Sequence, residues 1–163
     1  MKHGFTLIEL VLMIALLGIM VALYVESTGD LSDVAVDGAS RKAQSDIRYA
    51  QQLAQTTGAR YGVKFNEDGN YEVYVGSPGN PVRDPHTGQN MIEDFSRFPG
   101  VHIDDDYQVE FDSIGKPTIG GDGRARFVAT SGAIRDVYVI DQTGAVTFEL
   151  IQLGTGCSCE LCN

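Results

Sequence analysis

Apolar and polar positions divide the chain into an apolar start, an amphipathic middle and a long stretch of short alternating segments. Residues 5–25 are almost entirely apolar, and Glu9 is the one side chain among them that is charged at neutral pH. A helix of these 21 residues would be roughly 30 Å long, which matches the hydrocarbon core of a bilayer. The pattern therefore predicts a transmembrane helix over residues 5–25.

A helical stripe follows between residues 37 and 57, where apolar side chains recur at spacings of three and four. Its members are Ala39, Ala43, Ile47, Ala50 and Ala54. Because most of them are alanines, the stripe suits close packing against a sheet or another helix. Gly58 is the expected end of this helix. The polar residues 26–36 allow a bend or a fresh start, and residues 26–58 are predicted to continue the first helix as one long stalk.

Residues 59–163 indicate strands and turns. The turn sequence at residues 66–70 predicts a hairpin between the first two strands. The predicted strands are residues 60–65, 71–75, 101–103, 107–111, 124–129, 135–140 and 145–150. Since neighbours along the chain pair locally, the sheet is expected to be antiparallel. The prediction is an α+β fold, in which a long N-terminal hydrophobic helix packs on a small antiparallel β-sheet head.

Two parts of the head do not follow this pattern of short strands and turns. Residues 76–100 hold four of the five prolines and form a predicted loop of a length that is usually functional or mobile. The tail, residues 157–163, holds all three cysteines, which are Cys157, Cys159 and Cys162. An odd number favours a disulfide between two of them, with the third free or joined to another chain. Ligation of a soft metal by the three thiolates is the weaker alternative.

Glu9 makes the start of the chain unusual, because a lone carboxylate in hydrocarbon costs roughly 2.5 kcal/mol or more. A cleaved secretory signal would have an apolar region of about 7–15 residues and a small-residue cleavage site, so the run here is too long. A plain membrane anchor fits the length and the basic Lys2, but it leaves Glu9 without a role.

The sequence Gly4-Phe5-Thr6-Leu7-Ile8-Glu9-Leu10 resembles the leader junction of type IV prepilins and type II secretion pseudopilins. The resemblance implies that residues 1–4 are a leader, which prepilin peptidase removes after Gly4, and that Phe5 becomes the N-methylated terminus. It implies that Glu9 pairs with the terminal amine of a neighbouring subunit during assembly, and that residues 5–25 form a transmembrane and filament-core helix. A buried amine facing a buried carboxylate satisfies two groups that would each be costly alone.

A second resemblance lies in the head. The turn Phe111-Asp112-Ser113-Ile114-Gly115-Lys116-Pro117, followed by the strand, turn and strand of residues 137–146, is similar to the GspH/FimT group of minor pilins and pseudopilins. The function that this implies is that of a non-enzymatic minor subunit of a type II secretion pseudopilus or a type IV pilus, with a role in protein secretion or pilus biogenesis. Two alternatives stay open: an adhesive or DNA-uptake minor pilin, and a membrane-anchored periplasmic enzyme with a pilin-like leader.

The same resemblance implies the partners and the location. The partners would be other pilin subunits, the prepilin peptidase and the inner-membrane assembly platform. The chain would cross the inner membrane once, with a periplasmic head, and would enter a filament on assembly. Its charge disfavours nucleic acid, because 22 Asp and Glu residues face 12 Lys and Arg residues. Loss of Lys2 with the leader would leave 11 basic residues and a net charge of about −11.

Few residues indicate a chemical site. His86 and His102 are too few and too scattered to predict a metal site or a catalytic triad. Asp104-Asp105-Asp106 is a candidate calcium cluster, because hard cations prefer carboxylate oxygens. On an acidic chain a solvated turn is the favoured interpretation of these aspartates, and no cofactor or metal is expected.

Overall fold

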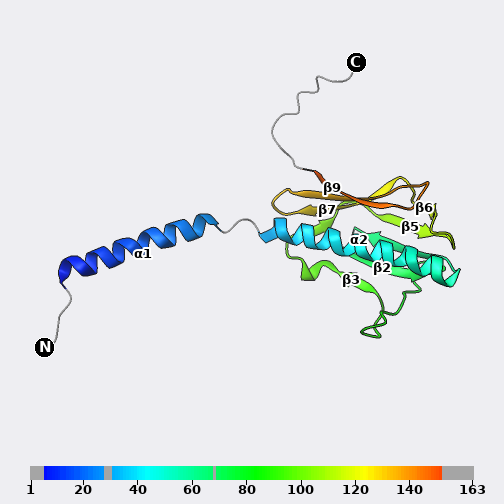
Figure 1. The fold of residues 1–163 in the computed structure, drawn as a ribbon, viewed down its shortest axis with the longest axis horizontal. Helices are drawn as coiled ribbons and strands as arrows, with labels where there is room; N and C mark the ends of the chain where they lie inside the picture. Colours follow the sequence, from blue (N-terminus) through cyan, green and yellow to red (C-terminus); the bar gives the residue numbers. More distant parts are fainter. Residues whose placement is uncertain (1–5, 28–30, 68, 152–163) are drawn as a thin grey trace, which may run out of the picture. The chain divides into compact units, whose positions relative to one another are not determined.

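The computed structural model describes residues 6–27, 31–67 and 69–151, and the chain divides into two compact units, residues 1–31 and residues 32–163. The first unit contains helix α1 (Leu7–Ser27). The second, called the head below, contains the sheets and nearly all of helix α2 (Leu31–Thr57), which begins at the boundary (Figure 1). The prediction of one stalk helix through residue 57 is not confirmed, because residues 28–30 lie outside the described part of the chain.

The described strands of the head form two sheets. One sheet has five strands in the order β3-β2-β1-β5-β6, and the other has four in the order β4-β7-β8-β9. The strands are β1 (Tyr61–Asn66), β2 (Asn70–Val75), β3 (Ile92–Asp94), β4 (Val101–Ile103), β5 (Tyr107–Phe111), β6 (Pro117–Ile119), β7 (Gly123–Ala129), β8 (Ile134–Val139) and β9 (Val146–Ile151). Each described pair of strands is antiparallel, as predicted. The prediction of a single small sheet is wrong, because the strands form two sheets.

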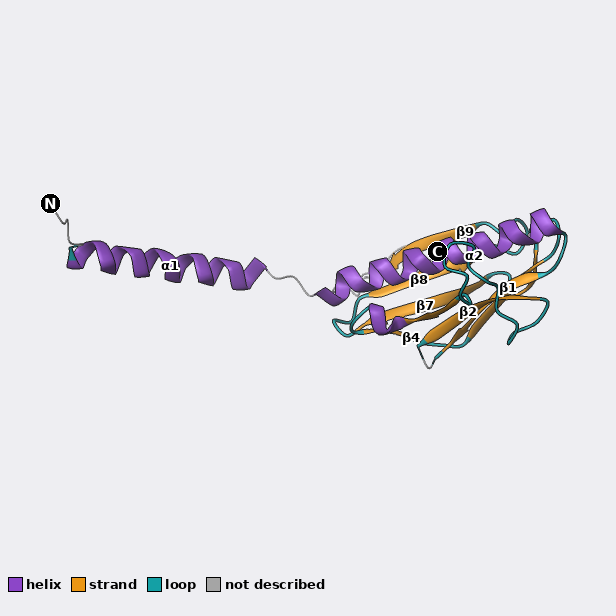
Figure 2. Ribbon diagram, turned by 90° about the horizontal axis from the view of Figure 1, so that it is seen from below, coloured by secondary structure: helices purple, strands orange, loops and turns teal. Residues whose placement is uncertain are grey.

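The α2 stripe is buried as its spacing predicts. Each of its five apolar members is 0% exposed, and they are Ala39, Ala43, Ile47, Ala50 and Ala54. The helix ends at Thr57, and Gly58 adopts a φ of 75°, a left-handed conformation that glycine tolerates. Figures 1 and 2 show α2 lying along both sheets. Small side chains on the buried face allow the helix to approach both of them closely.

Polar contacts fix α2 to the four-stranded sheet and to the β5–β6 turn. The Arg135 guanidinium on β8 lies 2.6 Å from the Asp37 carboxylate, and Arg48 donates to the carbonyl oxygen of Val146 at 2.9 Å. Gln51 donates to the carbonyl oxygen of Gly115 at 2.8 Å. The helix is therefore held at several points along its length, which fixes its rotation as well as its position.

The β5–β6 turn is the segment that carries the second sequence resemblance, and its local structure follows from its sequence. One oxygen of the Asp112 carboxylate accepts hydrogen bonds from the N–H groups of Ile114, at 3.0 Å, and Lys116, at 2.9 Å. An aspartate that holds the next backbone groups in this way favours a tight turn. Gly115 has a φ of 83°, and a Cβ atom there would collide with the Gln55 side chain of α2. The glycine is thus needed both for the turn and for its close contact with the helix.

Aromatic rings from both sheets meet in the core. The Phe127 ring of β7 lies edge-on to the Phe65 ring of β1, with centroids 6.0 Å apart. Phe95 packs against Phe127 with centroids 5.6 Å apart, and Tyr71 of β2 packs against Phe65 at 5.0 Å. This cluster joins the two sheets, because Phe127 belongs to the four-stranded sheet and its neighbours to the other half of the head.

The prediction of a loop over residues 76–100 is only partly right. This segment contains β3 and a short 3₁₀ helix, η1 (Phe95–Arg97). Its first half folds back on β2, since the Val82 N–H donates to the Val73 carbonyl at 2.8 Å and the Met91 N–H donates to the Val82 carbonyl at 2.7 Å. The segment is therefore an ordered arm on the β3 edge of the five-stranded sheet.

Candidate functional site

The residues of the leader motif fall at or before the start of α1. Gly4 and Phe5 lie outside the described residues, as do Cys157, Cys159 and Cys162. Glu9 is described, and it lies exposed in the first turn of α1. The structure therefore places one of the predicted assembly residues and leaves the cleavage, methylation and disulfide predictions untested.

Thr6 caps the N-terminus of α1. Its carbonyl oxygen accepts hydrogen bonds from the N–H groups of Glu9, at 3.1 Å, and Leu10, at 3.2 Å, and its hydroxyl oxygen lies 3.4 Å from the Glu9 nitrogen. Thr6 and Glu9 have the spacing of a capping box, in which a Glu or Gln three residues after the cap helps to satisfy free N–H groups. A carboxylate is also favourable near the positive end of the helix dipole. Glu9 can thus stabilise its own helix, and a test of its role in assembly must separate the two effects.

Large apolar side chains are exposed along the part of α1 whose side chains are described. Leu7 is 82% exposed and Met20 is 70% exposed. The others are Ile8, Leu10, Val11, Leu12, Met13, Ile14, Leu16, Leu17, Ile19 and Val21. A contiguous apolar surface of this kind marks an interaction site. Among the described residues, no helix has the combined length and apolar character that crossing a membrane requires, so the predicted transmembrane segment is not confirmed.

A groove runs across the head between α2 and residues 84–97. It consists of two adjoining hollows of about 480 Å³ and 260 Å³, which share Lys42, Asp84 and Met91. The larger hollow is lined mainly by residues of β3, η1 and the part of the arm before β3. The smaller hollow lies between α2 and the arm. The arm that sequence analysis predicted as a loop therefore forms one wall of the groove.

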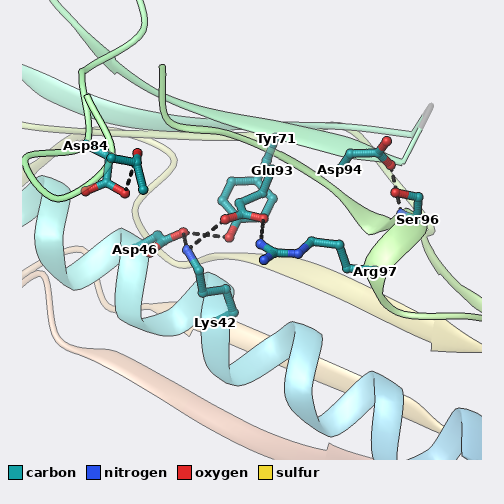
Figure 3. A network of polar contacts seen from close by, with 9 residues as sticks. Lys42, Asp46, Tyr71, Asp84, Glu93, Asp94, Ser96 and Arg97 are labelled. Atoms are coloured by element: carbon teal, nitrogen blue, oxygen red, sulfur yellow. Dashed lines mark hydrogen bonds and ion pairs between the residues drawn. The ribbon is translucent and has the colours of Figure 1, made fainter. Parts of the chain in front are cut away.

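A network of charged groups lies at the centre of the groove (Figure 3). The Lys42 ammonium of α2 lies 2.5 Å from the Asp46 carboxylate and 3.3 Å from the Glu93 carboxylate of β3. The Tyr71 hydroxyl of β2 donates to Asp46 at 2.6 Å, and the Arg97 guanidinium of η1 lies 3.2 Å from Glu93. The network ties α2 to β2, β3 and η1, and so holds the groove's two walls together.

Charge and burial determine the protonation of this network. Burial of the Lys42 ammonium lowers its pKa, but the hydrogen bonds and charges of Asp46 and Glu93 outweigh burial, so the pKa of Lys42 is raised above its usual value. Burial, reinforced by the Asp46 charge, raises the pKa of Tyr71 far above its usual value. Lys42 is therefore charged and Tyr71 neutral at physiological pH. The charged Lys42 and the neutral Tyr71 hydroxyl therefore suit the ion pairs and the hydrogen bond that join α2 to β2 and β3.

The Tyr71→Phe substitution is expected to lower the free energy of unfolding by about 1.5–3 kcal/mol, because it removes a buried hydrogen bond to a charged acceptor and keeps the ring. Urea denaturation followed by circular dichroism measures the loss. The matched control is Tyr61→Phe, since the Tyr61 hydroxyl forms no hydrogen bond within the described residues. Equal stability of the Tyr71→Phe variant and the parent chain would show that the bond to Asp46 contributes nothing.

The candidate calcium cluster makes contacts with the protein. Asp106 accepts a hydrogen bond from the Glu67 N–H at 2.8 Å, and the Asp104 carboxylate lies 4.0 Å from the Arg126 guanidinium. These contacts fit the interpretation of a surface turn. Within residues 6–27, 31–67 and 69–151, no three His, Cys, Asp or Glu side chains are grouped so that they could hold a metal ion.

The groove could not be predicted from the sequence. One signal of it was present, because Asp46 interrupts the buried face of α2 between Ala43 and Ala50, and a carboxylate in that position needs a partner. The spacing of Lys42 and Asp46 also favours an ion pair on a helix. The partners Tyr71 and Glu93 come from distant segments, which the spacing of residues along the chain does not reveal.

Comparison with known proteins supports the fold. No protein-family model and no curated protein matches the sequence. Among solved structures, the type IV minor pilin FimU of Pseudomonas aeruginosa matches with a TM-score of 0.54 and 13% sequence identity, over 70% of this chain and 87% of that chain. At this identity the likeness concerns the fold alone. The chain therefore has a pilin-like α+β fold, and the resemblance to type IV pilins is confirmed at that level.

Proposed function

We propose that the chain is a minor pilin or pseudopilin, a structural subunit that assembles with other pilin subunits through its N-terminal helix. The observation that carries the proposal is the position of Glu9, in the first turn of a helix with an exposed apolar surface, on a chain with a pilin-like fold. An apolar helix surface costs about 25 cal/mol per Å² when it is exposed to water, so α1 must be covered by lipid or by apolar helices of other subunits. The head's role is to present a surface.

The leader motif supplies the chemistry of assembly in this proposal. Prepilin peptidase cuts after Gly4, Phe5 becomes the methylated terminus, and its amine pairs with Glu9 of the neighbouring subunit. Pairing matters because a carboxylate that is buried among apolar helices without a cation is strongly destabilising. Before assembly the subunit is held in the inner membrane by residues 5–25 with a periplasmic head, and it joins the filament at the assembly platform. The assembled subunit then functions in protein secretion or pilus biogenesis.

Co-sedimentation tests this function. Cells that produce the full chain together with an assembly platform and a major pilin are sheared, and the filaments are collected by high-speed centrifugation. The proposal predicts that the chain appears in the filament pellet and is absent from it when the major pilin is left out. A chain that remains in the supernatant in both cases would contradict the proposal.

A further inference from the structure

The charges at the centre of the groove balance one another. Lys42 lies between the carboxylates of Asp46 and Glu93, and Arg97 provides a second cation beside Glu93. Two cations thus face two carboxylates within hydrogen-bonding or ion-pair distance. The centre of the groove therefore has little net charge to offer a ligand.

The two ends of the groove are different. Figure 3 shows Asp84 and Asp94 at opposite ends of the network, with Glu93 between them. An Asp84 oxygen accepts from the His86 N–H at 2.8 Å, and an Asp94 oxygen accepts from the Ser96 N–H at 2.8 Å. Within the described part of the chain, neither carboxylate forms an ion pair. Each end of the groove therefore has a carboxylate without an ion-pair partner among the described residues.

Asp84 is held ionised by its surroundings. The hydrogen bond from the His86 N–H, together with that from the Thr87 hydroxyl, keeps the pKa of Asp84 below its usual value. These bonds also fix the direction of the carboxylate. The carboxylate is thus a part-exposed negative group, held in one direction, that lines both hollows of the groove.

The wall that carries Asp84 is formed in advance of any ligand. The Asp84 N–H donates to the Gln89 carbonyl at 2.8 Å, and the Gly88 N–H donates to the Asp84 carbonyl at 2.8 Å, so the tip of the arm is a closed turn. The bonds of the arm to β2 hold its base. Between the two ends the lining is mixed, with amide groups of Gln89 and Asn90 and the apolar side chain of Met91. A preformed groove of this kind loses little conformational entropy on binding.

We propose that this groove binds an extended polypeptide segment of a partner protein that carries basic side chains, one against Asp84 and another against Asp94. A metal ion does not account for the site, because the described residues contain no group of three ligating side chains. Two separated carboxylates favour a ligand with two separated cations. An extended chain can provide them at several separations, since side chains on one of its faces recur about every 7 Å, and its amides can pair with the polar lining. The proposal goes beyond filament assembly and is independent of it.

Isothermal titration calorimetry on the full chain in a mild non-ionic detergent tests this proposal. The probe is a blocked decapeptide of alternating lysine and serine at low ionic strength, and the same peptide with glutamate in place of lysine is the first control. The groove variant combines Asp84→Asn and Asp94→Asn. Asparagine accepts the same backbone hydrogen bonds as aspartate, so the turns are retained while two charges are lost. Circular dichroism checks that the fold is unchanged.

A matched charge control separates specific binding from general attraction to an acidic protein. The variant Asp112→Asn with Asp141→Asn removes the same number of charges from turns that do not line the groove. The groove variant is expected to weaken binding of the lysine peptide at least about tenfold, and the control variant less than about twofold. No binding by the parent chain, or equal weakening in the two variants, would overturn the proposal. Binding of spermidine as tightly as the peptide would overturn its polypeptide part.

Discussion

Replacing Phe127 with alanine is expected to lower the free energy of unfolding of the head by about 3–5 kcal/mol. The side chain is 0% exposed, and its ring packs against Phe65 of the other sheet and against Phe95. Truncation leaves a cavity where the two sheets meet, and it removes the aromatic contacts that join them. Because domains of this size are stable by only about 5–15 kcal/mol, the loss is a large share of the total.

Urea denaturation of the full chain, followed by circular dichroism, measures this effect. The control is Ile114→Ala, because Ile114 is 75% exposed at the β5–β6 turn and its truncation is expected to change stability by no more than about 0.5 kcal/mol. Losses of similar size in both variants would show that the aromatic cluster does not hold the sheets together.

Replacing Glu9 with glutamine is expected to reduce incorporation into filaments by about two orders of magnitude or more. Breaking a buried ion pair by removal of one partner costs about 3–5 kcal/mol, and about 1.4 kcal/mol corresponds to a tenfold change in an equilibrium. Glutamine serves in a capping box as well as glutamate does, so the helix start should be preserved. Quantitative immunoblotting of sheared filaments against whole cells gives the incorporated fraction.

The Thr6→Ala substitution is the complementary control for Glu9. It removes the hydroxyl of the cap and leaves the carboxylate, at a cost to the helix of about 0.5–2 kcal/mol. If the charge matters, Thr6→Ala should be incorporated nearly as well as the parent chain while Glu9→Gln is not. The opposite pattern, with Thr6→Ala excluded and Glu9→Gln retained, would assign Glu9 to helix capping alone.

Local sequence predicted those elements whose geometry is set by neighbours along the chain. The α2 stripe could be predicted because residues three and four apart lie on one face of a helix, and the buried Ala43 and Ile47 confirm it. The hairpin at residues 66–70 could be predicted from its turn residues, and β1 and β2 do pair there. The turn after Phe111 is similar, because Asp112 fixes the following backbone with its own side chain.

Strands β3 and β6 were not predicted, because neither shows the apolar–polar–apolar alternation that indicated the equally short β4. Ile92–Asp94 lies in a segment rich in proline and is a strand only because β2 offers it an edge. Pro117–Ile119 likewise depends on β5. The separation into two sheets was missed because the spacing of strands along the chain does not show which strands pair with one another.

The candidate groove could not be recognised from the sequence, because packing between distant segments forms it. Lys42 and Glu93 are far apart in the sequence, and they meet because the arm folds back on β2 and α2 crosses the sheet beside it. The arm was singled out by its prolines, which is a signal of unusual structure but gives no indication of its partner. The leader motif, by contrast, is continuous in sequence. Its assignment depends on cleavage and methylation, which the fold does not reveal.

The central claim is that the leader is removed after Gly4, so that the chain is a processed pilin-like subunit. Glu9 is then the fifth residue of the mature chain. Mass spectrometry of the N-terminal peptide, from protein purified out of cells that contain a prepilin peptidase, tests it most directly. The account predicts a peptide that starts at Phe5 and carries one methyl group on its amine. A peptide that starts at Met1 or Lys2 would contradict it.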